Sequence, residues 1–166
     1  MRKLPVTLMA LAPFLVATPA MAENADSATA ELVDPNHDPN HVPSGITADV
    51  TFHDNGSRLR VTGIAQGMDP MKKYISLIYD PGSKATGANA CLPSNPSPLN
   101  FDKMQLGDWQ PIGSSTRTLD AERLGVAYIT LSQFGTVSIR GFVQPVTGGP
   151  NAALPLQACG KVVPQR

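Results

Sequence analysis

The chain has few of the residues from which catalytic and metal sites are built. Its 166 residues include only three His, two Cys and one Trp, and 16% of the residues are charged. The 13 basic residues balance the 13 acidic ones, and no basic block occurs along the chain. Proteins that bind nucleic acid or anionic membrane surfaces usually carry such blocks. The sequence therefore predicts neither as a partner.

Sequence motifs of several enzyme classes are also missing. The chain contains no Gly-x-Ser-x-Gly elbow for a hydrolase nucleophile. It has no Gly-rich loop with a Lys to hold phosphate, and no Cys-x-x-Cys pair for zinc or redox chemistry. From these absences we predict no catalytic residue and no bound cofactor.

Residues 1–22 are predicted to be a signal peptide. Two basic residues precede an apolar run over residues 4–16, and Ala20-Met21-Ala22 supplies the small residues of a cleavage site. The alternative, a retained membrane anchor, is disfavoured because the apolar run is too short to span a bilayer, and no longer run follows. Cleavage would leave 144 of the 166 residues and, by removing two basic residues, a net charge of −2. We therefore expect an exported protein, periplasmic or secreted.

The two Cys residues, Cys91 and Cys159, are predicted to form a disulfide. They lie 68 residues apart in a chain expected to reach an oxidising compartment, where such pairs form readily. On the chain-entropy model a bridge closing a loop of this length stabilises the fold by about 4 kcal/mol. The alternative is a pair of free, buried thiols.

Residues 23–45 are predicted to be a disordered polar arm. The segment is rich in Pro and small residues and shows no apolar periodicity. The tetrapeptide Asp-Pro-Asn-His occurs twice in it, ending at His37 and His41. Two imidazoles four residues apart could share a Cu(II), Zn(II) or Ni(II) ion. The alternative is a solvated linker whose repeat has no function.

Residues 46–166 are predicted to form one all-β domain. Apolar and polar residues alternate from Ile46 to His53, as in a half-buried strand, and a turn signal follows at residues 54–56. Further strands are predicted at residues 59–63, 74–79, 126–131, 137–143 and 156–163. A long irregular stretch over residues 80–111 interrupts them. Six or more short strands without an amphipathic helix favour a β-sandwich or a closed barrel.

Several short motifs resemble those of the copper/zinc superoxide dismutase family. Residues 59–67 followed by 74–82 are similar to the family's segment leading into its copper site. Leu106-Gly107-Asp108 is similar to the Gly-Asp step after its zinc loop, and Gln157-Ala158-Cys159-Gly160 to its C-terminal Ala-Cys-Gly. Cys91 lies where the family's disulfide partner lies. The resemblance covers residues 46–163 and implies a Greek-key β-barrel or sandwich. It also implies a homodimer, since folds of this family often pair.

The positions at which that family binds copper differ in this chain. Where the family places two copper-binding His residues, one residue apart, this chain has Leu77 and Tyr79. Neither side chain ligates copper as imidazole does. Val146 lies where the last copper-binding His would fall, and Leu156 where the family has the Arg that guides superoxide.

The zinc positions differ as well. Gln105 stands where the last zinc His would fall, and no His occurs after His53. Asp108 resembles the one metal ligand that remains, although an Asp in this setting is more often a hydrogen-bond acceptor in a loop. The resemblance therefore implies the family's fold without its metals or its activity.

The leading interpretation is an exported, non-catalytic domain of the superoxide dismutase type, with a binding or structural role. Its partner would be another extracytoplasmic protein or a second copy of the chain, and no metal is expected inside the barrel. One alternative is copper or zinc binding through His37 and His41. Another is an enzyme, either an atypical superoxide dismutase or one that uses the stretch over residues 80–111 as a pocket wall.

Overall fold

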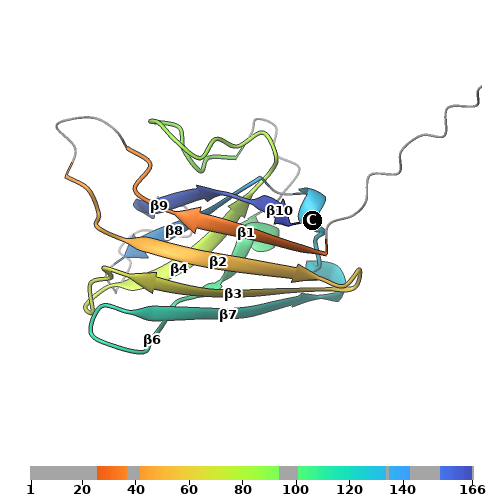
Figure 1. Ribbon diagram of the computed structural model, residues 1–166, viewed down its shortest axis with the longest axis horizontal. Helices are drawn as coiled ribbons and strands as arrows, with labels where there is room; N and C mark the ends of the chain where they lie inside the picture. Colours follow the sequence, from red (N-terminus) through yellow and green to blue (C-terminus); the bar gives the residue numbers. More distant parts are fainter. Residues whose placement is uncertain (1–25, 37–41, 94–100, 134, 143–153, 166) are drawn as a thin grey trace, which may run out of the picture.

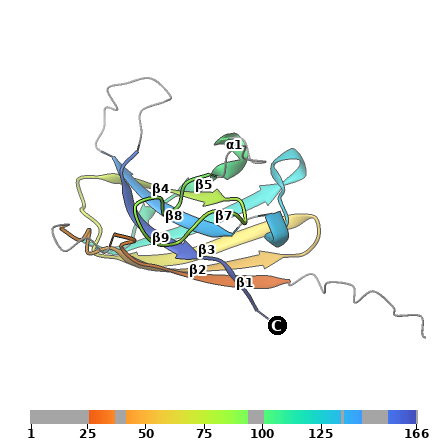
Figure 2. The ribbon, with the colours of Figure 1, turned by 90° about the horizontal axis from the view of Figure 1, so that it is seen from above.

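The structure is a computed structural model that describes residues 26–36, 42–93, 101–133, 135–142 and 154–165. These residues form two packed antiparallel sheets, which Figure 1 shows face-on and Figure 2 from above. The all-β sandwich with one disulfide that the sequence predicts is confirmed. Within the described residues, no helix has the length and apolar character needed to cross a membrane.

The larger sheet has six strands, and its central strands are the longest. In sheet order the strands are β10 (Val163–Gln165), β1 (Ser27–Leu32), β2 (Thr47–Asp54), β3 (Arg58–Gln66), β7 (Arg117–Leu124) and β6 (Gln110–Pro111). β2 and β3 pair along their full length, and β3 pairs with β7 in the same way. The short outer strands β10 and β6 each contain a Pro, which limits pairing with further strands.

The smaller sheet has four strands. In sheet order they are β5 (Gln105–Asp108), β4 (Lys73–Tyr79), β8 (Thr136–Phe142) and β9 (Leu156–Lys161). Short helical turns lie between strands: α1 (Phe101–Met104), η1 (Gly125–Ala127) and η2 (Leu131–Gln133). The chain changes sheet between β3 and β4, between β5 and β6, between β7 and β8, and between β9 and β10. The core lies between the two sheets.

The two sheets meet along a seam between β1 and β9. Val33, just after β1, and Cys159 of β9 exchange two backbone hydrogen bonds of 3.3 and 2.9 Å. Gly160 lies directly against the backbone carbonyl of Glu31, so close that there is no room for a Cβ. The seam therefore depends on a residue without a side chain at position 160.

Two strands with little apolar surface were not predicted from the sequence. Residues 27–32, expected to belong to a disordered arm, form β1 inside the six-stranded sheet. Its inward residues include Ala28 and Ala30, whose small side chains make the alternation of apolar and polar residues hard to recognise. β7 was not predicted because Leu119 is the one large aliphatic residue that it buries, while its inward set also includes Arg117.

Two more predictions fail where apolar residues are buried without forming the expected elements. The strand predicted at residues 126–131 is wrong, because η1, a short loop and η2 occupy this segment. Ile129 in the loop and Leu131 in η2 are nevertheless buried. The irregular stretch over residues 80–111 is also wrong in part, since it contains α1, β5 and β6. β5 has only four residues, too few to show a period of two clearly.

We expect Gly160→Ala to lower the free energy of unfolding by about 1–3 kcal/mol, because the added methyl must push β9 away from β1. Gly113→Ala is the matched control, since the nearest atom to a Cβ there is 3.7 Å away. Urea unfolding of both variants measures the difference. Equal losses of stability in the two variants would contradict a closely packed seam.

Candidate functional site

The positions that resemble copper ligands lie on β4, which is buried on both faces. Tyr74, Ser76 and Ile78 face the core, and the alternate residues Leu77 and Tyr79 face the opposite side of the sheet. Leu77 is only 6% exposed and Tyr79 2%. On that outer side the sheet is covered by the loop that carries Cys91. These two positions are therefore part of a packed layer.

The guanidinium of Arg140 organises this layer. Arg140 lies on β8, and both its Nε and one Nη donate to the Tyr79 hydroxyl oxygen at 3.3 and 3.0 Å. The same Nη donates to the Cys91 carbonyl at 2.8 Å, and the other Nη to the Leu154 carbonyl at 3.0 Å. Ser138 Oγ lies 3.1 Å from the Tyr79 hydroxyl oxygen. One cation thus joins two strands, the disulfide loop and the segment before β9.

The disulfide between Cys91 and Cys159 is confirmed, and it fastens this loop to β9. Cys91 is fully buried and has a φ of 48°, a left-handed conformation that non-Gly residues rarely adopt. Its N–H donates to the Lys84 carbonyl at 2.8 Å, while its own carbonyl accepts from Arg140. Backbone and side-chain bonds together hold Cys91 in this conformation.

The other described positions that resemble metal ligands or the guiding Arg lie on β5 and β9. Asp108 is exposed and lies opposite Ile75 on β4, four residues along the strand from Tyr79. Gln105 lies opposite Leu77, and Leu156 is the cross-strand neighbour of Arg140. Val146 lies outside the described residues. Within the described parts of the chain, no three His, Cys, Asp or Glu side chains are placed to hold a metal ion together.

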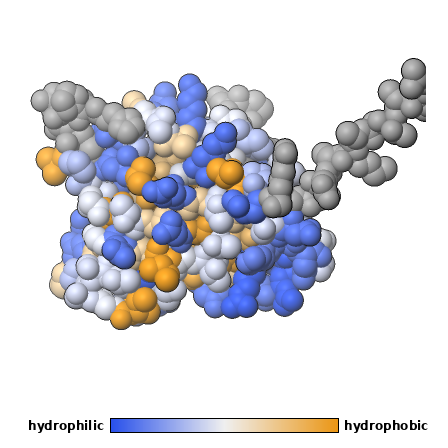
Figure 3. Space-filling model, viewed as in Figure 1, coloured by the Kyte–Doolittle hydropathy of each residue, from blue (hydrophilic) through white to orange (hydrophobic). Residues whose placement is uncertain are grey.

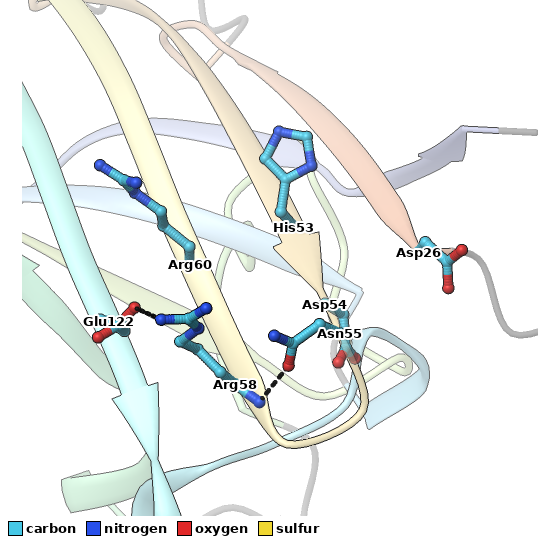
Figure 4. Close-up of a pocket in the computed structure, with 7 residues that line it drawn as sticks. All are labelled: Asp26, His53, Asp54, Asn55, Arg58, Arg60 and Glu122. Carbon is cyan, nitrogen blue, oxygen red and sulfur yellow. Dashed lines mark hydrogen bonds and ion pairs between the residues drawn. The ribbon is translucent and has the colours of Figure 1, made fainter.

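His37 and His41, the predicted metal-binding pair, also lie outside the described residues. The third His, His53, is exposed on the outer face of β2. It lines an open hollow of about 660 Å³ at the end of the six-stranded sheet where β2 turns into β3 (Figure 4). We call this the polar hollow. Its lining residues are Asp26, His53, Asp54, Asn55, Arg58, Arg60 and Glu122.

The two Arg residues of the polar hollow form ion pairs across strands. Arg58 of β3 forms an ion pair of 3.2 Å with Glu122 of β7, and Arg60 forms one of 3.2 Å with Asp120. All four side chains are more than 40% exposed, so each pair contributes little stability, about 0–1 kcal/mol. Figure 3 shows hydrophilic residues gathered at this end of the molecule. The hollow is an exposed, charged surface.

Asp54 at the base of the hollow has a structural task. Its Oδ1 accepts from the Tyr128 hydroxyl at 2.6 Å, and its Oδ2 accepts from the Leu131 N–H at 3.1 Å. These bonds tie the β2–β3 turn to the connection between β7 and β8. The hydrogen bond to Asp54 raises the pKa of Tyr128 to about 12, because it stabilises the protonated phenol.

A second, smaller hollow of about 370 Å³ lies at the opposite end of β3, where that strand leads into β4. Asp108 and Trp109 line it from the segment over residues 80–111, but Asp80 does not. Arg117 lines it too, and its guanidinium donates to three backbone carbonyls of residues 69–72. The Trp109 indole N–H donates to Ser76 Oγ at 2.8 Å inside the core. Arg117 and Trp109 are therefore engaged in holding the fold together.

Comparisons with known proteins show the fold and no more. No protein-family model matches the chain, and no curated protein matches it. Among solved structures the chain is similar to one described as the clock protein EA4, with a TM-score of 0.59 and 17% sequence identity. The match covers 86% of this chain and 96% of that one. At this identity the likeness extends to the β architecture alone.

Sequence reasoning missed Arg140. Residues alternate between the two faces of β8, which places Ile139 in the core and Arg140 on the other face. Its partners come from β4, the disulfide loop and the segment before β9, and only the strand register brings them together. No local motif marks such a residue.

We expect Arg140→Met to lower the free energy of unfolding by about 1–3 kcal/mol. The substitution removes the hydrogen bonds that Arg140 donates to the Cys91 and Leu154 carbonyls. Arg60→Met is the matched control, since it breaks an exposed ion pair and should cost at most about 1 kcal/mol. Urea unfolding of both variants gives the comparison. If Arg140→Met cost no more than Arg60→Met, the Arg140 cluster would be an incidental surface contact.

The link between Tyr128 and Asp54 predicts a loss of stability at high pH. The folded-state pKa of about 12 exceeds the ordinary value of 10.0, so this link stabilises fully below pH 10 and is lost as the pH rises toward 12. The stability difference between the parent protein and Tyr128→Phe should therefore shrink over that range. Titration of tyrosinate by absorbance should show a transition near pH 12. Tyr128→Phe should remove this transition, and Asp54→Asn should move it toward pH 10. An unchanged titration in Asp54→Asn would refute the link.

Proposed function

We propose that this chain is an exported β domain of the copper/zinc superoxide dismutase type that has no dismutase activity and acts as a binding or structural domain. The observation that carries the proposal is the packed layer around Tyr79 and Arg140. The two positions that resemble copper ligands hold buried Leu77 and Tyr79, and the Tyr79 hydroxyl is already bonded to a cation.

The chemistry of superoxide dismutation supports this reading. The reaction needs a metal that cycles between redox states, an open coordination position and a positive charge that attracts the anion. Leu77 offers no ligand atom, and the phenol oxygen of Tyr79 accepts from Arg140. Arg140 lies directly beside Leu156, the position that resembles the family's guiding Arg. Its guanidinium donates four hydrogen bonds within the protein, so it acts as a fixed cross-link.

Assignment to this family rests on the sequence motifs together with the sandwich that carries them. The disulfide joins the loop after β4 to β9, which is the arrangement that the motif around Cys159 implies. The similarity to the clock protein EA4 supports the β fold that we propose and says nothing about activity.

For a binding role, the polar hollow is the candidate contact surface. Its basic residues lie on β2 and β3 and its acidic partners on β7, at one exposed end of the sandwich. Exposed pairs of this kind contribute more to partner choice and orientation than to the stability of the domain. The partner would be another extracytoplasmic protein with a polar, charged surface.

Copper or zinc binding through His37 and His41 is the second candidate function. The observation that favours it is the anchoring of the residues on either side of the two His. Asp34 accepts from the N–H groups of Asn36 and Ser44 at 2.9 and 2.7 Å, and Ser44 also donates to the Gln157 carbonyl at 2.7 Å. The Asp34 carboxylate thus holds residues on both sides of the two His close together. Less conformational entropy would then be lost when a metal binds.

Metal content and superoxide consumption of the purified protein test both candidates. After incubation with Cu(II) and Zn(II) and removal of free metal, we expect no superoxide turnover. Any retained metal should be lost in the double variant His37→Ala with His41→Ala and kept in the control His53→Ala. Metal absent from the parent protein would refute the second candidate alone. Stoichiometric copper that survives the double variant, together with superoxide turnover, would refute the leading one.

A further inference from the structure

We propose that Asn55 is a self-modification site, at which the backbone nitrogen of Gly56 displaces the side-chain ammonia and converts Asn55 into Asp or isoaspartate. Asn55 is the only Asn in the chain that is followed by Gly. A Gly on the carboxyl side leaves the attacking nitrogen unhindered, because no side chain flanks it.

The site is an exposed turn. Asn55, Gly56 and Ser57 lie between β2 and β3, and all three are exposed to solvent. Gly56 has a φ of +84°, and a Cβ placed there would find no atom within 4 Å. The turn therefore has room for the ring that the reaction forms and for the water that opens it.

Asp54 is placed to act on the nucleophile. The N–H of Gly56 donates to Asp54 Oδ1 at 2.9 Å. As the Gly56 nitrogen attacks, its proton must leave, and a carboxylate already bonded to that N–H is in place to accept it as a general base. The Tyr128 hydroxyl donates to the same oxygen at 2.6 Å, so it competes with the Gly56 N–H for the oxygen that would accept the proton.

The carbonyl that is attacked is also surrounded by donors. Asn55 Oδ1 accepts from the Arg58 N–H at 2.9 Å and from the Ser57 N–H and hydroxyl, both at 3.2 Å. Negative charge develops on this oxygen when the nitrogen adds to Cγ, and preorganised donors stabilise such a charge. The turn thus combines a base on the nucleophile with three donors on the developing oxyanion.

The reaction is balanced with water as the only added reagent. A bond forms between the Gly56 nitrogen and Asn55 Cγ, and the bond from Cγ to Nδ2 breaks. Asp54 takes the proton from the Gly56 nitrogen and passes it to the departing Nδ2 group of Asn55. That group leaves as ammonia. Water then opens the five-membered imide at one of its two carbonyls, giving Asp or isoaspartate.

The product would change the polar hollow. Asn55 lines that hollow beside Arg58, so a new carboxylate would add one negative charge next to an existing ion pair. Isoaspartate would also add one backbone atom to the turn whose Asp54 holds Tyr128 and Leu131. Conversion would thus change both the charge of the hollow and the backbone of the turn.

The test compares the conversion rate in the native protein with that in the same protein unfolded in urea, at one pH and temperature. Peptide mass spectrometry, with an enzymatic assay for isoaspartate, follows Asn55 and uses the other Asn residues as internal references. We expect Asn55 to convert several-fold faster in the native protein than in the unfolded chain. A native rate equal to or below the unfolded rate, or no conversion at Asn55, would overturn the proposal.

Variants separate the two activating features. Asp54→Asn should slow native conversion by about tenfold or more, because it removes the base. Ser57→Ala is exposed and should keep the fold while slowing conversion through loss of one donor, and Ser132→Ala, an exposed Ser elsewhere, should change nothing. Tyr128→Phe should accelerate conversion, since it frees one oxygen of Asp54. If Ser57→Ala and Tyr128→Phe both reacted at the parent rate, the turn would not be activating the reaction.

Discussion

The guanidinium of Arg140 is the contact on which the outer layer of the four-stranded sheet depends. It bonds to the Tyr79 hydroxyl, to the Cys91 carbonyl and to the Leu154 carbonyl, so a single cation joins β4, the disulfide loop and the approach to β9. A half-buried cation is stable here because four hydrogen bonds replace its hydration. The disulfide between Cys91 and Cys159 adds a covalent link between the same loop and the same strand. Together they cover the face of the sheet on which Leu77 and Tyr79 lie, and they keep it closed.

A second arginine has the same kind of task at another crossover. Arg117 on β7 is 7% exposed, and it donates to backbone carbonyls of the β3–β4 connection while its guanidinium stacks over the Tyr74 ring at 5.3 Å. Burial of the phenol raises the pKa of Tyr74. In a chain with few charges, both cations satisfy carbonyls of connecting segments that have no strand partner. Such a use of Arg is structural.

The sequence predicted the elements whose apolar residues are large and alternate clearly. Strands β2, β3 and β8 follow from that pattern, and β4 follows from its β-branched and aromatic residues. β9 was also predicted, and the disulfide follows from two Cys in a chain that we expect to be exported. β1 was missed because Ala28 and Ala30 give too weak a period, and β7 because it places Arg117 in the interior. The Arg140 cluster could not be predicted, since its partners Tyr79, Cys91 and Leu154 are brought together by strand register and a crossover loop. The polar hollow likewise depends on the pairing of β3 with β7.

Anomalous diffraction from crystals grown with Cu(II) tests the central claim most directly, because it locates copper without reference to activity. The account predicts no copper peak beside the Tyr79 hydroxyl, with Arg140 bonded to that oxygen and to the Cys91 carbonyl as described. A copper peak within bonding distance of Tyr79, with Arg140 displaced from it, would contradict the account. It would mean that the layer opens to admit a metal, and that the fold has kept a metal site under a different set of ligands.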